Sequence, residues 1–220
     1  VAGPALGGVI YLAGPEIVYA LGAAGLLVAT VMTLFIRTKT ERGQRQPTTL
    51  STLFAGLRYV YNKKIIFGAI TLDLFVVLLG GVTALFPVFA KDILETGAAG
   101  AGFLRSAMAG GALLSGIMLT QMALERSVGK ILFATVLIFG VTTIIFGLSN
   151  LFWLSLLSMA VLGAADMISV NIRVTLLQIA TPDEMRGRVS AVNSVFTGAS
   201  NEIGEFRAGV MAAFVGAVPA

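Results

Sequence analysis

The chain has 220 residues, of which 57% are hydrophobic and only 12% are charged. A soluble domain carries roughly twice that share of charged residues, so the composition excludes an ordinary soluble fold and predicts an all-α protein that crosses a membrane several times. The chain contains no cysteine and no histidine, which excludes disulfides, thiolate chemistry and almost all transition-metal sites, so we expect neither a metal nor a cofactor.

The net charge of +4 is compatible with binding to nucleic acid. The positive residues lie mainly between the apolar segments, however, which is the pattern of membrane topology. We therefore expect no nucleic-acid partner. An enzyme is also the least favoured class, because the chain has no Ser-His or Cys-His pair and no recognisable nucleophile with its base.

The predicted membrane spans are apolar segments of about 20 residues, which is long enough for a helix to cross a bilayer. A partial segment at 1–12 opens the chain, and complete segments follow at 17–36, 65–90, 99–121, 130–148, 151–178 and 188–215. We expect about six or seven transmembrane helices. Neither end carries the features of a natural terminus, so we expect the chain to be a fragment of a longer protein.

The distribution of lysine and arginine predicts the orientation of these spans. The long loop at 37–64 carries seven of these residues, and the loops at 124–130 and 181–188 carry two each, whereas the alternate loops carry only Lys91. Because lysine and arginine accumulate in cytoplasmic loops, we expect the 37–64 loop to be cytoplasmic. We also expect the protein to be a multi-pass protein of the inner (plasma) membrane.

Within this loop, residues 50–61 carry apolar side chains at helical spacing, after the breaker Pro47. The pattern predicts an amphipathic helix, and we expect it to lie on the cytoplasmic surface of the membrane. Binding of a partner by this helix is the alternative interpretation.

Small residues form faces on several predicted spans. Ala107, Gly111 and Ser115 repeat every four residues within the span at 99–121. Faces of this kind let helix backbones approach closely in a membrane, so we expect close packing there. They also permit helices to slide past one another.

Ionisable residues within the predicted spans are the main candidates for function. A charged side chain in hydrocarbon costs at least a few kcal/mol, so such residues usually line a pathway or pair with one another. Glu202 and Glu205 share one helix face, where double ionisation is unfavourable and one carboxyl can hold a proton near neutral pH. We interpret them as a proton-coupling site. The alternative is a structural ion pair with Arg105, which lies at similar depth.

Asp73 and Asp166 are two further candidates for the proton or transport pathway. Asp73 has no cation nearby in the sequence, so either another helix supplies one or the carboxylate faces a water-filled cavity. Asp166 and Arg173 share a helix face but lie about 10 Å apart along the axis, which is too far for a direct ion pair. We expect Arg173 to snorkel towards the cytoplasmic interface. Arg207 lies beside Glu205 in the sequence and can neutralise it.

Two motifs resemble the major facilitator superfamily of transporters. The segment "GPALGG" resembles the end of the glycine-proline motif in the fifth helix of its antiporters, where Pro4 would bend the helix. The glycines that would allow close packing there are Gly3, Gly7 and Gly8. The segment "TPDEMRGRVSAVNSVFTGASNEIGEF" at 181–206 resembles the eleventh helix and its preceding loop in the enterobactin-exporter-like, drug:proton antiporter branch.

The resemblance covers essentially the whole chain and implies a major facilitator-type helical bundle that is incomplete, with helices five to eleven of twelve. Residues 1–36 would end the N-terminal six-helix half, and 37–64 would form the cytoplasmic linker. Residues 65–220 would supply five of the six helices of the C-terminal half. The missing helices of the full-length protein are then expected partners.

The loop at 124–130 departs from the family's pattern. The gating loop of the superfamily runs Asp-Arg-x-Gly-Arg, whereas "ERSVGK" has an extra residue and ends in lysine. We assign a cytoplasmic gating role to this loop and to the one at 181–188, and the departure leaves the usual charge-relay role open. The residues assigned to this gate are Glu125, Arg126, Gly129, Lys130, Arg186 and Arg188.

The resemblance further implies a secondary active exporter of small amphipathic molecules, such as siderophores or macrolide-like compounds, coupled to protons and working by alternating access. Its partners would be the lipid bilayer, a small-molecule substrate and protons. Two alternatives remain open. A passive facilitator or channel would ignore a proton gradient, and a non-transporting membrane scaffold would act through the amphipathic helix.

Overall fold

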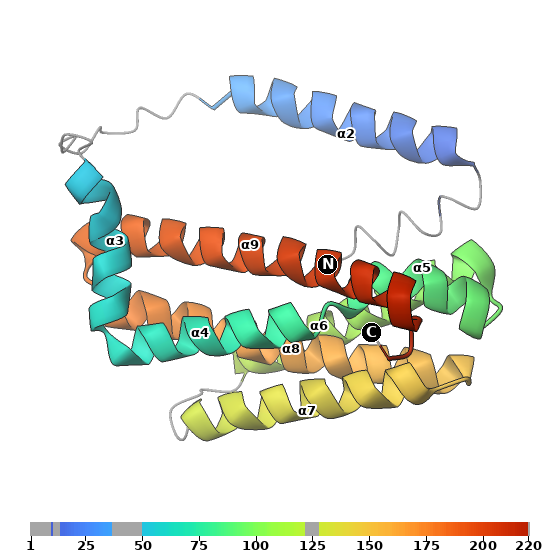
Figure 1. The fold of residues 1–220 in the computed structure, drawn as a ribbon. Coiled ribbons are helices and arrows are strands. Elements are labelled where there is room, and N and C mark those ends of the chain that lie inside the picture. The colour runs from blue at the N-terminus through green and yellow to red at the C-terminus, as the bar shows by residue number, and fades with distance from the viewer. Residues whose placement is uncertain (1–9, 11–13, 37–49, 122–127, 220) are drawn as a thin grey trace.

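The computed structural model describes residues 10, 14–36, 50–121 and 128–219, which form long helices without any β-strand (Figure 1). The long helices in chain order are α2 (Pro15–Leu34), α3 (Leu50–Asn62), α4 (Lys64–Leu79), α6 (Gly97–Gln121), α7 (Val128–Leu148), α8 (Phe152–Ala180) and α9 (Asp183–Val215). Between α4 and α6 lie a 3₁₀ turn η1 (Val82–Leu85), the short α5 (Phe86–Val88) and a π-helical turn η2 (Phe89–Ile93).

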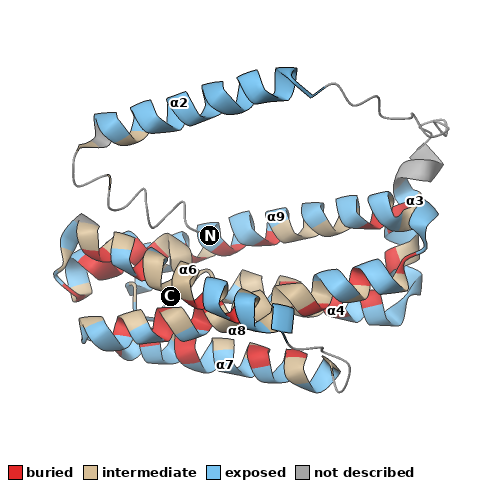
Figure 2. Ribbon diagram, turned by 180° about the vertical axis from the view of Figure 1, so that it is seen from behind, coloured by how far each residue is buried: buried red, intermediate tan, exposed pale blue. Residues whose placement is uncertain are grey.

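Helices α4, α6, α7, α8 and α9 form a bundle in which α8 is central. Helices α6 and α7 pack against α8, and α4 packs against α9 (Figure 1). Helix α2 lies apart from this bundle, and none of the residues in its apolar stretch is buried (Figure 2). The predicted all-α, multi-pass architecture is therefore confirmed.

Helices α6 and α8 cross in direct backbone contact, because a small residue lies at each contact point. A Cβ atom added to Gly111 would overlap the carbonyl group of Ala160, and one added to Gly163 would overlap that of Met108. Ser115, one turn further along α6, is buried. The small-residue face predicted from the sequence is thus a packing surface, as expected between helices in a membrane.

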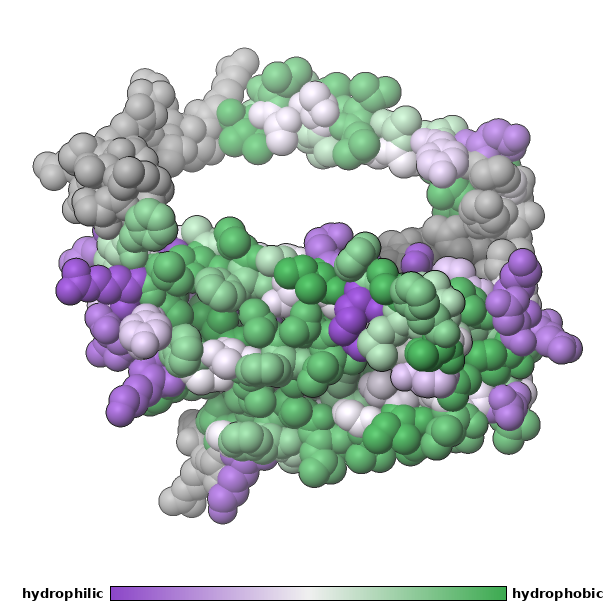
Figure 3. Space-filling view, viewed as in Figure 1, coloured by the Kyte–Doolittle hydropathy of each residue, from purple (hydrophilic) through white to green (hydrophobic). Residues whose placement is uncertain are grey.

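Much of the outer surface of the bundle is apolar. In the part of the chain that the structure describes, five helical segments are long and apolar enough to cross a membrane, and they are Glu16–Leu34, Lys64–Ile93, Ala99–Gln121, Val128–Leu148 and Phe152–Ala180. Figure 3 shows a mostly apolar face of the bundle, with hydrophilic residues gathered towards its two ends and a smaller hydrophilic patch between them. The span expected at 188–215 lies in one continuous 33-residue helix, α9, but it is not among these five apolar segments. Helix α9 joins the bundle by packing against α4.

Helix α3 packs its apolar side against the bundle. Val60 is 3% exposed and belongs to a cluster with Ile66 of α4, Leu177 of α8 and Val189 of α9. Tyr59 Oη donates a hydrogen bond of 2.8 Å to the last carbonyl group of α8. A helix is thus present where the sequence predicts one, and it contacts the ends of α8 and α9. Its place on the cytoplasmic surface of the membrane stays a prediction.

Candidate functional site

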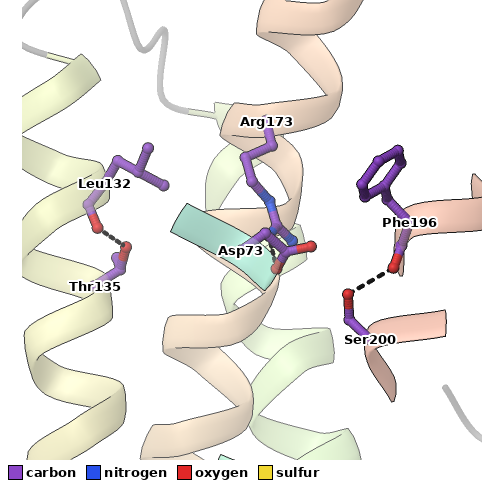
Figure 4. A network of polar contacts seen from close by, with 6 residues as sticks. All are labelled: Asp73, Leu132, Thr135, Arg173, Phe196 and Ser200. Atoms are coloured by element: carbon purple, nitrogen blue, oxygen red, sulfur yellow. Dashed lines mark hydrogen bonds and ion pairs between the residues drawn. The ribbon is translucent and has the colours of Figure 1, made fainter. Parts of the chain in front are cut away.

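A buried ion pair joins α4 to α8 within the apolar part of the bundle. The guanidinium group of Arg173 contacts the carboxylate of Asp73, and the two side chains are only 11% and 10% exposed. Figure 4 shows them pointing towards each other from two neighbouring helices. The sequence left two alternatives for Asp73, a cation from another helix or a water-filled cavity. The structure shows the first, because α8 supplies the cation.

The expectation that Arg173 snorkels to the cytoplasmic interface is wrong. Arg173 lies seven residues before the end of α8, about 10 Å along the helix axis. Its side chain instead turns to α4, where Asp73 neutralises it. A guanidinium group buried without a counter-ion is strongly unfavourable, which is the physical reason for the pairing.

Asp166 lies two turns before Arg173 on α8 and is partly buried. Within residues 14–36, 50–121 and 128–219, its carboxylate has no ion-pair partner. The helical rise separates it from Arg173 by about 10 Å along the axis, in agreement with the expected lack of a direct pair. A partly buried, unpaired carboxylate can take up a proton or meet a positive group on a ligand.

The membrane span that begins with α4 is interrupted after Leu79. A Cβ atom on Gly81 would lie 2.6 Å from the carbonyl oxygen of Gly204 in α9. In turn, a Cβ atom on Gly204 would lie 2.6 Å from the carbonyl oxygen of Val77. Only glycine permits this approach, so α9 crosses the interruption in backbone contact with α4.

Two side chains of α9 bind on either side of this interruption. Arg207 donates from Nε to the carbonyl oxygen of Leu78 at 2.9 Å and from Nη2 to that of Leu79 at 2.8 Å. These carbonyl groups belong to the last turn of α4, where backbone acceptors lack helical partners and the helix dipole is negative. Beyond the interruption, Thr83 Oγ1 donates a 2.9 Å hydrogen bond to the carboxylate of Glu205.

A small cavity of about 70 Å³ lies beside the interruption. Its walls include Gly81, Thr143 of α7 and Arg207. A cavity of this size can hold water molecules. Water held there would lie beside the polar groups of the interrupted span.

The glutamates and Arg105 are not brought together. Arg105 is exposed on α6, which packs mainly against α8, and Glu202 is exposed on α9. Among the residues that the structure describes, no ion pair joins Arg105 to Glu202 or Glu205. The proton-coupling role of the two glutamates does not depend on this pair and stays a prediction.

The gating residues that the structure describes lie at helix starts. Gly129 and Lys130 are exposed at the beginning of α7. Arg186 and Arg188 lie in the first turns of α9, and Arg186 forms an exposed ion pair of 2.7 Å with Asp183. The starts of α7 and α9 lie at the same end of the bundle (Figure 1). Several predicted residues lie outside the described part of the chain, and these are Gly3, Pro4, Gly7, Gly8, Glu125 and Arg126.

Sequence reasoning missed the interrupted span and the contacts that hold it. A signal was present, because consecutive glycines at 80 and 81 in the middle of an apolar segment favour a helix end or kink. From the sequence, Arg207 is predicted only to neutralise its neighbour Glu205. The packing of α9 on α4 is what brings its guanidinium group to Leu78 and Leu79.

The buried ion pair between apolar helices, together with the interrupted span, is typical of a polytopic α-helical membrane protein. The chain belongs to the major facilitator family described as transmembrane secretion effectors, whose family model matches residues 1–220. The family resemblance and the fold class predicted from the sequence are thereby confirmed.

Similar proteins carry the name enterobactin exporter EntS. Those of Escherichia coli O81 (strain ED1a) and Shigella dysenteriae serotype 1 (strain Sd197) are each 26% identical to this chain over 190 residues. The match covers 86% of this chain and 45% of each relative, so the chain spans about half the length of the curated relatives it matches. No solved structure gives a significant match.

Proposed function

We propose that the protein exports small amphipathic molecules across the inner membrane by alternating access. The family supports transport, and the name shared by its relatives supports export. In this proposal residues 1–36 end the N-terminal half, 37–64 form the cytoplasmic linker and 65–220 supply most of the C-terminal half. The remaining helices of the full-length protein complete the substrate path.

The buried pair of Asp73 and Arg173 is the observation that carries this proposal. A buried ion pair contributes little net stability, but the loss of one partner is strongly destabilising. Protonation of Asp73 removes the counter-ion of Arg173, so the contact between α4 and α8 then depends on protonation. Asp166, two turns away on α8, supplies a second carboxylate that can bind a proton.

Helix α9 extends the proposed proton path. Glu205 accepts a hydrogen bond from Thr83 beyond the interruption, so its protonation would change the contact between α9 and η1. Glu202 lies one turn before it and is exposed. The described gate residues Lys130, Arg186 and Arg188 would then meet the N-terminal half at the cytoplasmic end.

The test follows a dye substrate in proteoliposomes that contain the protein at its full natural length, under an imposed pH gradient. We expect Asp73→Asn to reduce gradient-driven transport by about tenfold or more, because the amide cannot couple Arg173 to a proton. Asp92→Asn is the matched control, because Asp92 is an exposed carboxylate at the far end of the same span. Normal transport by Asp73→Asn would remove Asp73 from the coupling path.

The same assay separates the alternatives. A passive facilitator or channel would move the dye without a gradient, and a scaffold would move none. Separate Glu202→Gln and Glu205→Gln variants test the path through α9. Loss of gradient-driven transport with dye binding retained, in either variant, would assign coupling to that helix.

A further inference from the structure

An open apolar groove of about 580 Å³ lies between α3, α4 and α9. Phe67, Ile70 and Leu74 of α4 line it at the spacing of one helix face. Phe54 of α3 and Phe196 of α9 form parts of its other walls. A groove of this size and character is large enough to hold much of a small ligand or a lipid chain.

The charge beside this groove is positive. Among the described residues that line it, Arg58 is the only charged one, and its side chain is exposed. Lys63 and Lys64 are also exposed, where α3 meets α4. Two carboxylates, Asp183 and Glu184, lie at the start of α9. Asp183 forms an ion pair with Arg186, so of these two only Glu184 remains to offset the cations. Arg58 therefore gives the lining of the groove a positive charge, and Lys63 and Lys64 follow α3 directly in the chain.

The position of the groove selects its occupant. Phe54 is 61% exposed and Tyr61 is 72% exposed, so α3 presents aromatic rings whose contact with water is unfavourable. In the proposed orientation, α3 lies at the cytoplasmic surface and α4 enters the hydrocarbon from there. Anionic phospholipids gather in that leaflet, and basic pockets at helix junctions on that side bind their head groups.

We propose that the groove binds an anionic phospholipid of the cytoplasmic leaflet, with an acyl chain along α4 and the phosphate at Arg58. The lipid bridges the linker helix α3 to α4 and α9, because residues of all three helices line the groove. The proposal rests on the orientation given in the proposed function but does not require transport, so its test uses a binding readout.

The test uses photoactivatable phosphatidylglycerol and phosphatidylcholine that carry the reactive group near the end of an acyl chain. Each is incorporated into vesicles with the full-length protein, and labelled peptides are mapped by mass spectrometry. We expect phosphatidylglycerol to label residues 54–74 in preference to phosphatidylcholine. We expect Arg58→Gln to reduce that preference about fivefold, which is the effect of one cation near the membrane surface.

Three variants make the result specific. Arg58→Lys should keep the preference because it keeps the charge, and Lys130→Gln should keep it because Lys130 is an exposed cation on α7 that does not line the groove. Leu74→Trp should fill the groove and reduce labelling of α4 by both lipids. Equal labelling of the wild type by the two lipids, or an unchanged preference in Arg58→Gln, would overturn the proposal. Absence of label from 54–74, or its displacement by the transported dye, would also overturn it by giving the groove another occupant.

Discussion

Arg173 and Arg207 are satisfied in different ways. Arg173 has a carboxylate as counter-ion, whereas Arg207 binds the backbone carbonyl groups of Leu78 and Leu79. The first solution depends on the protonation of Asp73. The second does not, because backbone carbonyl groups do not titrate and the dipole of α4 is permanent. Arg173 is thus suited to a contact that changes, and Arg207 to one that persists.

The Asp73–Arg173 pair should behave as a single unit in a double-mutant cycle. Asp73→Asn leaves a buried guanidinium group without its counter-ion, so we expect a loss of about 3–5 kcal/mol in the free energy of unfolding. Adding Arg173→Met should recover much of that loss, because an apolar side chain of similar length replaces the charge. Chemical unfolding of the detergent-solubilised protein measures both.

The exposed pair of Asp183 and Arg186 provides the comparison for this cycle. Its loss through Asp183→Asn should cost less than about 1 kcal/mol, because solvent screens both groups. Additive losses at Asp73 and Arg173 would show that the two charges do not depend on each other for stability.

At the scale of whole elements, the interruption after α4 sets how α4 and α9 fit together. Backbone contact at Gly81 and Gly204 lets the two helices approach closely, and Arg207 then reaches the exposed end of α4. A broken helix at membrane depth is tolerated only where protein groups or enclosed water satisfy its backbone. Arg207 contributes to that condition here by donating to the carbonyl groups of Leu78 and Leu79, and the adjacent cavity of about 70 Å³ can hold water.

A methyl group at this contact should force the helices apart. A Cβ atom on Gly204 would lie 2.6 Å from the carbonyl oxygen of Val77, so Gly204→Ala requires a backbone shift. We expect a loss of about 1–3 kcal/mol in unfolding free energy, which is typical of overpacking. Gly198→Ala is the control on the same helix, because its Cβ atom would meet nothing within 4 Å. If both variants unfold alike, close contact at Gly204 is not a source of stability.

For the whole molecule, the sequence predicts where the helices lie but not which helices and side chains contact one another. The segments expected at 99–121 and 130–148 became Gly97–Gln121 and Val128–Leu148, because length and apolar composition decide where a membrane helix lies. The pairing of Asp73 with Arg173 depends on the packing of helices far apart in the chain, which no local pattern encodes. The same holds for the bonds of Arg207 to the carbonyl groups of Leu78 and Leu79, because backbone acceptors leave no trace in the sequence.

The orientation of the molecule is the remaining prediction, and it follows from charge alone. The loop at 37–64 carries seven lysines and arginines, whereas residues 149–150 carry none. In a cysteine-free background, Asn150→Cys on intact cells should react with a membrane-impermeant thiol reagent, and Asn62→Cys should react only after permeabilisation, because both side chains are exposed but at opposite ends of the bundle. Ser155→Cys should resist the reagent in both conditions, because Ser155 is 0% exposed in α8. The reverse pattern at the first two positions would place α3 outside the cell. The groove beside Arg58 would then face the outer leaflet, and both the export model and the lipid site would lose the orientation on which they rest.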